Sequence, residues 1–230
     1  MKDIIYIVEN EIVDKMNAQV KVLSFIDNQI TVCDTKWARD GKTVTDSLSN
    51  AYTISSVDHG TNVIELTPNG AWSFSGETIT LPNPKFFVGT PIATNEEWES
   101  FDRDERNKVP FIWMVEPTSE TFFPKNSPFE RQSEIRLVFL DSNNHEQWRT
   151  KITHKERLQS LYNMVEWFIN SIRSNRNYFW SEDLSYQTRN FTKFGKETSQ
   201  GVDSNIIDAE LTGIDVTISL KIKALEECKC

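Results

Sequence analysis

The last strand-like run of the chain, Leu211–Lys223, constrains the fold more than any other segment. Its apolar side chains occupy every second position: Ile214, Val216, Ile218, Leu220 and Ile222. Because successive side chains of a strand point to opposite faces, this period of two predicts one face against a core and one face in water. The run therefore predicts a one-faced sheet that other elements must cover.

Three further segments supply neighbours and a cover for that strand. Residues 111–116 and 134–140 are dense in apolar and β-branched side chains and are typical of strands. Residues 3–16 predict an amphipathic helix that is too short to stand alone and should dock on the same sheet. Residues 154–174 predict a longer helix. Its apolar stripe consists of Leu158, Leu161, Tyr162, Val165, Phe168, Ile169 and Ile172.

The segment between the first helix and these strands has a different character. It contains closely spaced β-type runs separated by turn signals such as Asp27-Asn28 and Asp40-Gly41. The runs are Gln19–Ile26, Gln29–Cys33, Ala51–Val57, Asn62–Thr67, Ala71–Phe74, Thr78–Leu81 and Lys85–Val88. This spacing predicts a small all-β barrel or sandwich.

The predicted fold class is α+β, with one mixed or antiparallel sheet covered by amphipathic helices and an inserted small all-β barrel or sandwich. We divide the chain into three parts. Residues 1–16 are the N-terminal helix of the core domain, 17–91 the inserted all-β module, and 92–230 the α+β core domain.

Within the core domain, Thr94 and Glu97 have the spacing of a capping box and predict the start of a helix that ends before Pro110. Residues 117–132 are expected to form a loop between two strands. A further strand is expected near Thr188–Phe194.

Composition narrows the class of function. The 230 residues are 38% hydrophobic, enough for a substantial core, and the formal net charge is −9. Affinity for nucleic acid normally comes from Lys and Arg, so this charge argues against a protein whose main task is gripping DNA or RNA. Three cysteines (Cys33, Cys228 and Cys230) make a poor disulfide framework, and no stretch approaches the roughly 20 apolar residues of a membrane span. We expect a soluble protein made in a cytoplasm, without membrane contact.

No pattern of catalytic residues stands out. Asp40-Gly41-Lys42-Thr43 has the end of a phosphate-binding loop, but Lys36 stands where that loop needs a glycine, so a hairpin turn is the better interpretation. The His residues lack a zinc-binding spacing, and no Ser or Cys lies in a nucleophile elbow. We expect no enzymatic activity, no metal and no cofactor. A metal-dependent hydrolase built on scattered acids is the third-ranked hypothesis.

Aromatic residues gather in the predicted loop between the two strands. Phe122, Phe123 and Phe129 lie where a monomer would use polar turn residues. Their rings either pack back on the core or meet another subunit. We name them as candidate subunit-interface residues.

A second segment, Tyr186–Lys196, interleaves aromatic residues with positive charges. Arg189, Lys193 and Lys196 are candidates for contact with DNA or a partner. Phe191 and Phe194 cannot both face one side of a regular strand, and a bulge or turn that buries them is the favoured alternative.

The order of elements resembles that of a known family. A helix is followed by Pro110-Phe-Ile-Trp-Met-Val-Glu116, then by Ser133-Glu-Ile-Arg-Leu-Val-Phe-Leu-Asp141, a long helix, and Asp208-Ala-Glu-Leu-Thr-Gly-Ile-Asp-Val-Thr-Ile-Ser-Leu220. This order resembles the tail terminator and head-to-tail neck-ring proteins of tailed bacteriophages, as in phages of gut Bacteroidetes, crAss-like phages among them. The likeness covers residues 1–16 and about 94–230, as a pattern without an invariant signature. The insert departs from the compact form of the family.

The resemblance implies a structural virion protein, a subunit of a homo-oligomeric ring that connects portal to tail and lines the channel for genome ejection. Its partners would be copies of itself, portal or adaptor proteins and tail proteins, with viral DNA passing without sequence-specific binding. It would be found in the neck or tail of the virion, and in the host cytoplasm during assembly. An open sheet edge, such as that of the last strand, would offer backbone pairing to the next subunit.

The alternative is a non-enzymatic binding module whose aromatic-rich β-insert recognises a glycan or a protein. The residues that suggest it are Trp37, Tyr52, Trp72, Phe74, Phe86 and Phe87. Core packing explains the same aromatic residues more simply.

Overall fold

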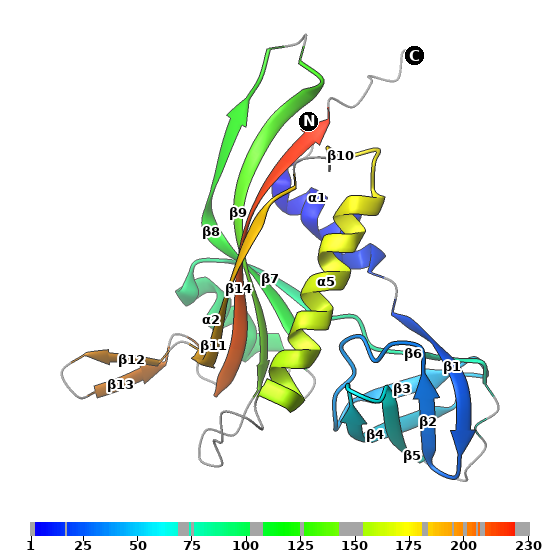
Figure 1. Ribbon diagram of the computed structural model, residues 1–230. Coiled ribbons are helices and arrows are strands. Elements are labelled where there is room, and N and C mark those ends of the chain that lie inside the picture. Colours follow the sequence, from blue (N-terminus) through cyan, green and yellow to red (C-terminus); the bar gives the residue numbers. More distant parts are fainter. Residues whose placement is uncertain are drawn as a thin grey trace.

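The protein, seen in a computed structural model, consists of a closed β-barrel and a curled sheet that carries the helices (Figure 1). The structure describes residues 3–16, 18–68, 74, 76–101, 108–124, 127–142, 154–180, 184–194, 196–199, 202–205, 207 and 210–223. At positions 129, 154, 156, 196–199 and 202–205 it describes the backbone alone. The predicted α+β class, a sheet with covering helices plus a small all-β unit, is confirmed.

Six short antiparallel strands close the barrel. They are β1 (Gln19–Ile26), β2 (Gln29–Val32), β3 (Thr43–Asp46), β4 (Ala51–Asp58), β5 (Val63–Pro68) and β6 (Thr78–Thr80). Their order is β1-β2-β5-β4-β3-β6, and β6 returns to pair with β1. Alternate side chains point inward, and the interior includes Val20, Ile30, Tyr52, Ile64 and Ile79.

The barrel decides between the two predicted architectures, because its ladder closes on itself and leaves no second sheet. Strand β3 was not predicted from the sequence, since Thr43-Val-Thr-Asp46 is short and mostly polar. Of the predicted run Ala71–Phe74 only Phe74 lies within the described residues, and its side chain is buried.

The second sheet contains β7 (Lys85–Gly89), β8 (Phe111–Phe122), β9 (Phe129–Ser142), β10 (Phe179–Trp180), β11 (Tyr186–Phe194) and β14 (Leu211–Lys223). Its order is β10-β14-β9-β8-β7, and β11 pairs with β14 on the same side as β10. The last strand, β14, therefore lies inside the sheet, and the expectation that it forms an open edge is wrong. The expected strand at Lys85–Val88 does form, but it pairs in parallel with β8 rather than joining the inserted module.

Strands β8 and β9 form a long ribbon that reaches the top of Figure 1, and β14 runs beside β9 as far as Phe129. The predicted loop at 117–132 is wrong, because most of it continues the two strands. The polar residues that suggested a loop follow a register shift between Val115 and Ser119, beyond which the side chains of β8 are half-buried or exposed, whereas Arg131 and Ser133 of β9 stay buried. A second hairpin, β12 (Lys196–Ser199) with β13 (Val202–Asn205), projects from the sheet at the left of Figure 1.

Helices α1 (Ile4–Glu11) and α5 (Gln159–Ser174) lie on one face of the sheet. A short 3-10 turn, η1 (Val13–Lys15), follows α1, and a π-helical turn, η2 (His154–Leu158), precedes α5. Residues of both helices share one buried cluster with the strands, for example Val8, Phe168 and Ile218. The predicted docking of the first helix on this sheet is consistent with that cluster.

The opposite face of the sheet is covered in its lower part by α2 (Pro91–Phe101). Trp98 of α2 packs on Phe87 and Phe111, with ring centroids 6.4 and 4.9 Å apart. Residues 211–216 of β14 are all buried, and only the later part of the strand shows the expected alternation. The prediction of a face in water is therefore wrong for the first half of β14.

Helix α2 begins at Pro91 rather than at Thr94. Thr90 precedes it, and its Oγ1 lies 3.4 Å from the amide of Ala93 while its carbonyl accepts from the amide of Thr94 at 2.9 Å. Thr90 thus acts as the cap, and a proline at the first helical position costs no hydrogen bond. Thr94 is fully buried inside the helix instead.

Candidate interaction surfaces

The tip of the β8–β9 ribbon is the first candidate surface. Phe122 is 54% exposed, Phe123 is half-buried, and the guanidinium of Arg131 lies 6.0 Å from the centre of the Phe122 ring. The side chain of Phe129 lies outside the described residues. Of the two alternatives for these aromatic rings, packing back on the core does not hold for Phe122.

The ribbon is held together by contacts between its two strands. Ser133 donates to Glu120 at 2.9 Å, and Arg131 Nε lies 3.3 Å from the same carboxylate. Ser133 and Arg131 are buried while Glu120 is half-buried. These contacts give the ribbon a fixed shape as far as Phe122, so the exposed ring is presented on a rigid arm.

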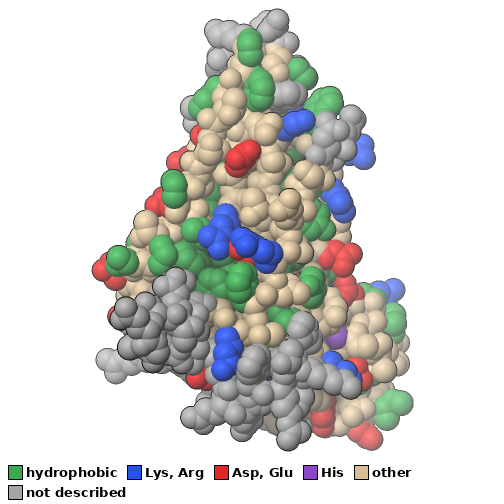
Figure 2. All heavy atoms as spheres, turned by 60° about the vertical axis from the view of Figure 1, so that its left-hand side comes forward, with side chains coloured by type: hydrophobic (Ala, Val, Ile, Leu, Met, Phe, Trp, Pro, Cys, Tyr) green, Lys and Arg blue, Asp and Glu red, His purple; other side chains and the backbone are tan. Residues whose placement is uncertain are grey.

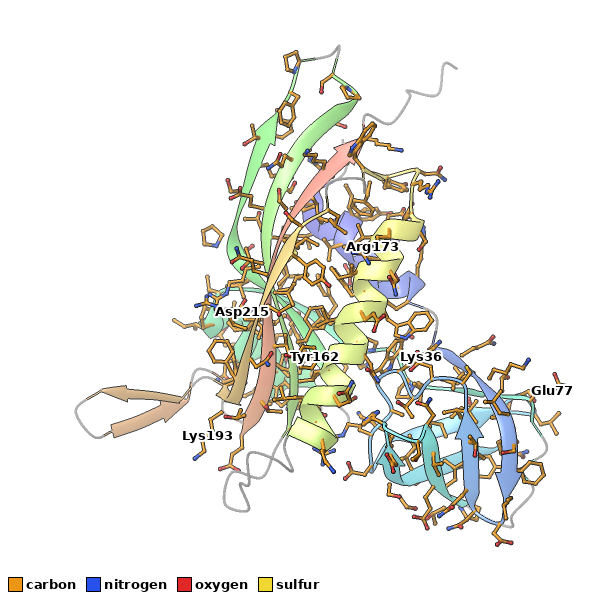
Figure 3. The ribbon with its side chains drawn as sticks, viewed as in Figure 1. Lys36, Glu77, Tyr162, Arg173, Lys193 and Asp215 are labelled. Atoms are coloured by element: carbon orange, nitrogen blue, oxygen red, sulfur yellow. The ribbon has the colours of Figure 1, made fainter. Side chains whose placement is uncertain are left out.

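The second candidate surface is the row of basic residues on β11. Arg189 is exposed, and Lys193 points away from the sheet near the lower end of the strand (Figure 3). The side chain of Lys196 lies outside the described residues. Figure 2 shows basic side chains gathered at the middle of this face, above a hydrophobic area.

A buried carboxylate lies at the centre of that basic row. Asp215 of β14 accepts from Arg136 of β9 through both Nε, at 3.1 Å, and Nη2, at 2.8 Å, and Arg189 Nη2 lies 3.7 Å away. The Asp215 side chain is 1% exposed, whereas those of Arg136 and Arg189 are 48% and 74% exposed. The cluster therefore carries one net positive charge rather than two, a relationship that the sequence pattern did not reveal.

Phe191 and Phe194 form the predicted bulge. The register of β11 against β14 shifts between these two residues, and their ring centroids lie 5.9 Å apart. Phe194 is buried beside Trp113, and Phe191 packs on the same cluster. The alternative interpretation of this segment, with the aromatic residues turned inward, is confirmed.

Most of the aromatic residues predicted for the β-insert are buried, and two of them, Phe86 and Phe87, lie on β7 of the main sheet. Trp37, Tyr52, Phe74 and Phe87 are each at most 5% exposed, Phe86 is half-buried, and Trp72 lies outside the described residues. The four buried rings offer no stacking surface to a glycan. Exposed hydrophobic residues of the barrel are Leu23, Phe25 and Ile26 at its β1–β2 hairpin, which are 61%, 51% and 73% exposed, and Leu48 between β3 and β4.

The barrel contacts α5 and the end of β9 through the segment between β2 and β3. Trp167 Nε1 donates to Asp34 at 3.1 Å and Asn163 donates to the Lys36 carbonyl at 2.9 Å. Figure 3 places Lys36 between the barrel and α5, and its ammonium lies 4.1 Å from the centre of the Trp167 ring. Burial lowers the pKa of Lys36, although Asp34 acts in the opposite direction.

A cavity of about 790 Å³ lies next to this contact, between the β4–β5 turn and the start of α5. His59 lines it, with Nδ1 2.7 Å from Thr35 Oγ1 and Nε2 buried without a hydrogen-bond partner among the described residues. Burial lowers the pKa of His59 and outweighs the opposing effect of Asp58 and Asp34. The remaining lining residues are Val57, Asp58, Gly60, Lys155, Gln159 and Tyr162.

Comparisons with known proteins give no family. No protein-family model matches the chain, and no curated protein is significantly similar to it. Among the described residues no group of three or more His, Cys, Asp or Glu is placed to hold a metal ion. Over the same residues, no helix has both the length and the apolar character needed to cross a bilayer.

Proposed function

We propose that this chain is a structural, non-enzymatic subunit of a homo-oligomeric ring in the neck or tail of a tailed bacteriophage, between portal and tail and around the genome channel. The observation that supports this proposal best is the β8–β9 ribbon. It is a rigid arm whose tip exposes 54% of Phe122. An isolated subunit gains nothing from an exposed aromatic ring on an arm, whereas a neighbouring subunit can bury it.

Burial of the Phe122 side chain would stabilise a ring-shaped oligomer substantially. Removing a Phe side chain from water contributes roughly 1.5–3 kcal/mol, and every interface of a cyclic assembly repeats the gain. In a heterologous interface the arm of one copy meets a different surface of the next. An elongated subunit with projecting arms, as in Figure 1, suits that kind of contact.

The charge distribution is compatible with the passage of DNA. The chain carries −9 in total, and Asp215 partly neutralises Arg136 and Arg189 on the sheet. A surface with few free cations releases few counterions on contact with phosphates and so holds DNA weakly. Within the proposal the partners are other copies of the chain, portal or adaptor proteins and tail proteins, without membrane contact, in the virion and in the host cytoplasm during assembly.

A second candidate function is a protein-binding module that uses the barrel. It is favoured by one observation, the three exposed hydrophobic residues Leu23, Phe25 and Ile26 at the β1–β2 hairpin. In the ring proposal the same hairpin would contact a portal, adaptor or tail protein. The two candidates differ in whether the chain forms a ring by itself.

Immunoelectron microscopy tests the proposed location. Gold-labelled antibodies raised against the purified chain should bind particles of the phage that encodes it at the junction of head and tail. Gold restricted to the capsid surface or to the tail tip would contradict the proposal. Antibodies against the major capsid protein provide the control for labelling along the particle.

A further inference from the structure

We infer that the ring closes by β-sheet pairing, with strand β7 of one copy joined to strand β11 of the next. This inference rests on the proposed ring and names the surfaces that form it. Strands β7 and β11 are the two edges of the lower part of the curled sheet. Hydrogen-bonding groups along a free strand edge readily pair with another strand.

The two edge strands are in register across the sheet, because their residues lie on the same rows, each row being a line of directly paired residues from strand to strand. One row runs from Arg189 through Asp215, Val138 and Trp113 to Phe87. The neighbouring rows follow the same register, so that the five residues Lys85–Gly89 share their rows with Phe191 back to Gln187. If the next copy lies at the same height along the ring axis, its β11 can pair with all five residues of β7 in the first copy.

Strand directions also fit. β7 is parallel to β8, while β8, β9, β14 and β11 are successively antiparallel. β7 and β11 consequently run in opposite directions, and copies related by rotation about one axis would join them as an antiparallel pair. The bulge after Phe191 ends the regular part of β11, so its straight edge matches the length of β7.

The faces of the two strands select this register. Val88 and Phe86 pack with the cluster under α5, and on β11 Asn190 contacts Tyr162 of α5. Matched rows keep these side chains on one face of the joined sheet. A shift by one residue would exchange the faces, and a shift by two would lose two of the five pairs.

The two edges are available for pairing. In the part of the chain that the structure describes, each edge strand has one strand neighbour: β7 has β8 and β11 has β14. Residues 186–190 of β11 are all exposed. Among the described residues the Thr188 side chain makes no hydrogen bond, and Val88 has no polar side-chain group, which makes this pair of residues a suitable probe.

Disulfide cross-linking tests the inference in a full-length chain in which Cys33, Cys228 and Cys230 are replaced by Ser. The test variant carries Thr188→Cys and Val88→Cys, and the control carries Asn190→Cys and Val88→Cys. Within one chain the two edges are separated by four strand spacings, roughly 19 Å, so neither pair can close inside a subunit. Directly opposite residues have Cα atoms about 5 Å apart, within reach of a disulfide, whereas the control pair is two residues out of register.

We expect the test variant to form a ladder of covalent oligomers under mild oxidation, at least five-fold more than the control. Equal cross-linking of both variants would overturn the inference. If the test variant forms rings visible by electron microscopy but no cross-links, the β7–β11 pairing is refuted while the proposal of a ring-shaped oligomer still holds. A chain that forms neither rings nor cross-links contradicts both proposals.

Hydrogen exchange on the unsubstituted protein gives an independent reading if a cysteine variant folds poorly. In the ring-shaped oligomer, the backbone amides of residues 187–191 and 85–89 that point away from the neighbouring strand of their own subunit should exchange at least ten-fold more slowly than in dissociated subunits. Unchanged exchange at both strands on ring formation would refute the pairing.

Discussion

Arg39 of the barrel and Asp141 at the end of β9 form an ion pair that is buried on both sides, with side chains 7% and 0% exposed. The pair joins the two sheets across 102 residues of sequence. Burial raises the pKa of Asp141, while Arg39 and Arg157 act in the opposite direction. The barrel is thus anchored to the main sheet by charges that water does not screen.

We expect Arg39→Met to lower the free energy of unfolding by about 3–5 kcal/mol, because it leaves a buried carboxylate without its partner. The double variant Arg39→Met/Asp141→Leu should recover most of that loss, since neither charge is then buried alone. Urea unfolding measures both effects. A single variant as stable as the original chain would show that the pair does not anchor the barrel.

The protein should lose stability between pH 7 and pH 5 through His59. Its folded-state pKa is lowered by burial from the ordinary 6.5, so below that pH the unfolded chain takes up the proton first. Stability then falls as the pH falls, until the pH is below the folded-state pKa. His59→Asn should show a smaller change over this range, measured as the free energy of unfolding at each pH. The same pH dependence in both proteins would contradict the assignment to His59.

Asp215 and Arg189 should contribute very differently to stability. Asp215→Asn should cost about 1–3 kcal/mol, because its buried carboxylate accepts several hydrogen bonds from Arg136. Arg189→Ala should change stability by less than about 0.5 kcal/mol, because Arg189 is 74% exposed and lies 3.7 Å from the carboxylate. Chemical denaturation compares the two. Equal losses would mean that Arg189 has a structural role.

Much of the fold followed from the sequence because period-two and helical patterns report local geometry directly. The strand Gln19–Ile26 formed as the pattern predicted, and the helix predicted at 154–174 formed as an α-helix from Gln159 after a π-helical turn at 154–158. The position of β14 inside the sheet did not follow, because its pattern does not show which strands lie beside it. Lys85–Val88 was assigned to the wrong sheet for the same reason, since pairing with residues 111–115 is a long-range choice.

The candidate surfaces were predictable only in part. The inward turn of Phe191 and Phe194 follows from residue types that do not fit a regular strand, whereas the sequence left open whether Phe122 packs on the core or is exposed. The link between Arg136 and Asp215 joins residues 79 positions apart, and no local pattern encodes it. Likewise, Asp215 lies at a position that alternation assigned to water, and its carboxylate is buried against the side chains of Arg136 and Arg189.

Phe122→Asp should prevent ring assembly without destabilising the subunit. The aromatic ring of Phe122 is exposed in the monomer, so the melting temperature should change by no more than about 2 °C. A charge at a buried interface, by contrast, strongly opposes association. Ile26→Asp is the matched control, because Ile26 is 73% exposed on the barrel, away from the ribbon. Size-exclusion chromatography with light scattering, together with a thermal melt, reads out both properties. If only the Ile26→Asp control lost assembly, the subunit interface would lie at the β1–β2 hairpin of the barrel and not at Phe122.

The central claim, that the chain forms a closed ring of identical subunits, is tested most directly by native mass spectrometry of the purified protein at high concentration. We expect one dominant species whose mass is a whole-number multiple of 26.7 kDa, with no ladder of larger forms, because a closed ring leaves no free interface. A mass of 26.7 kDa at every concentration, or an open-ended series of masses, would contradict it.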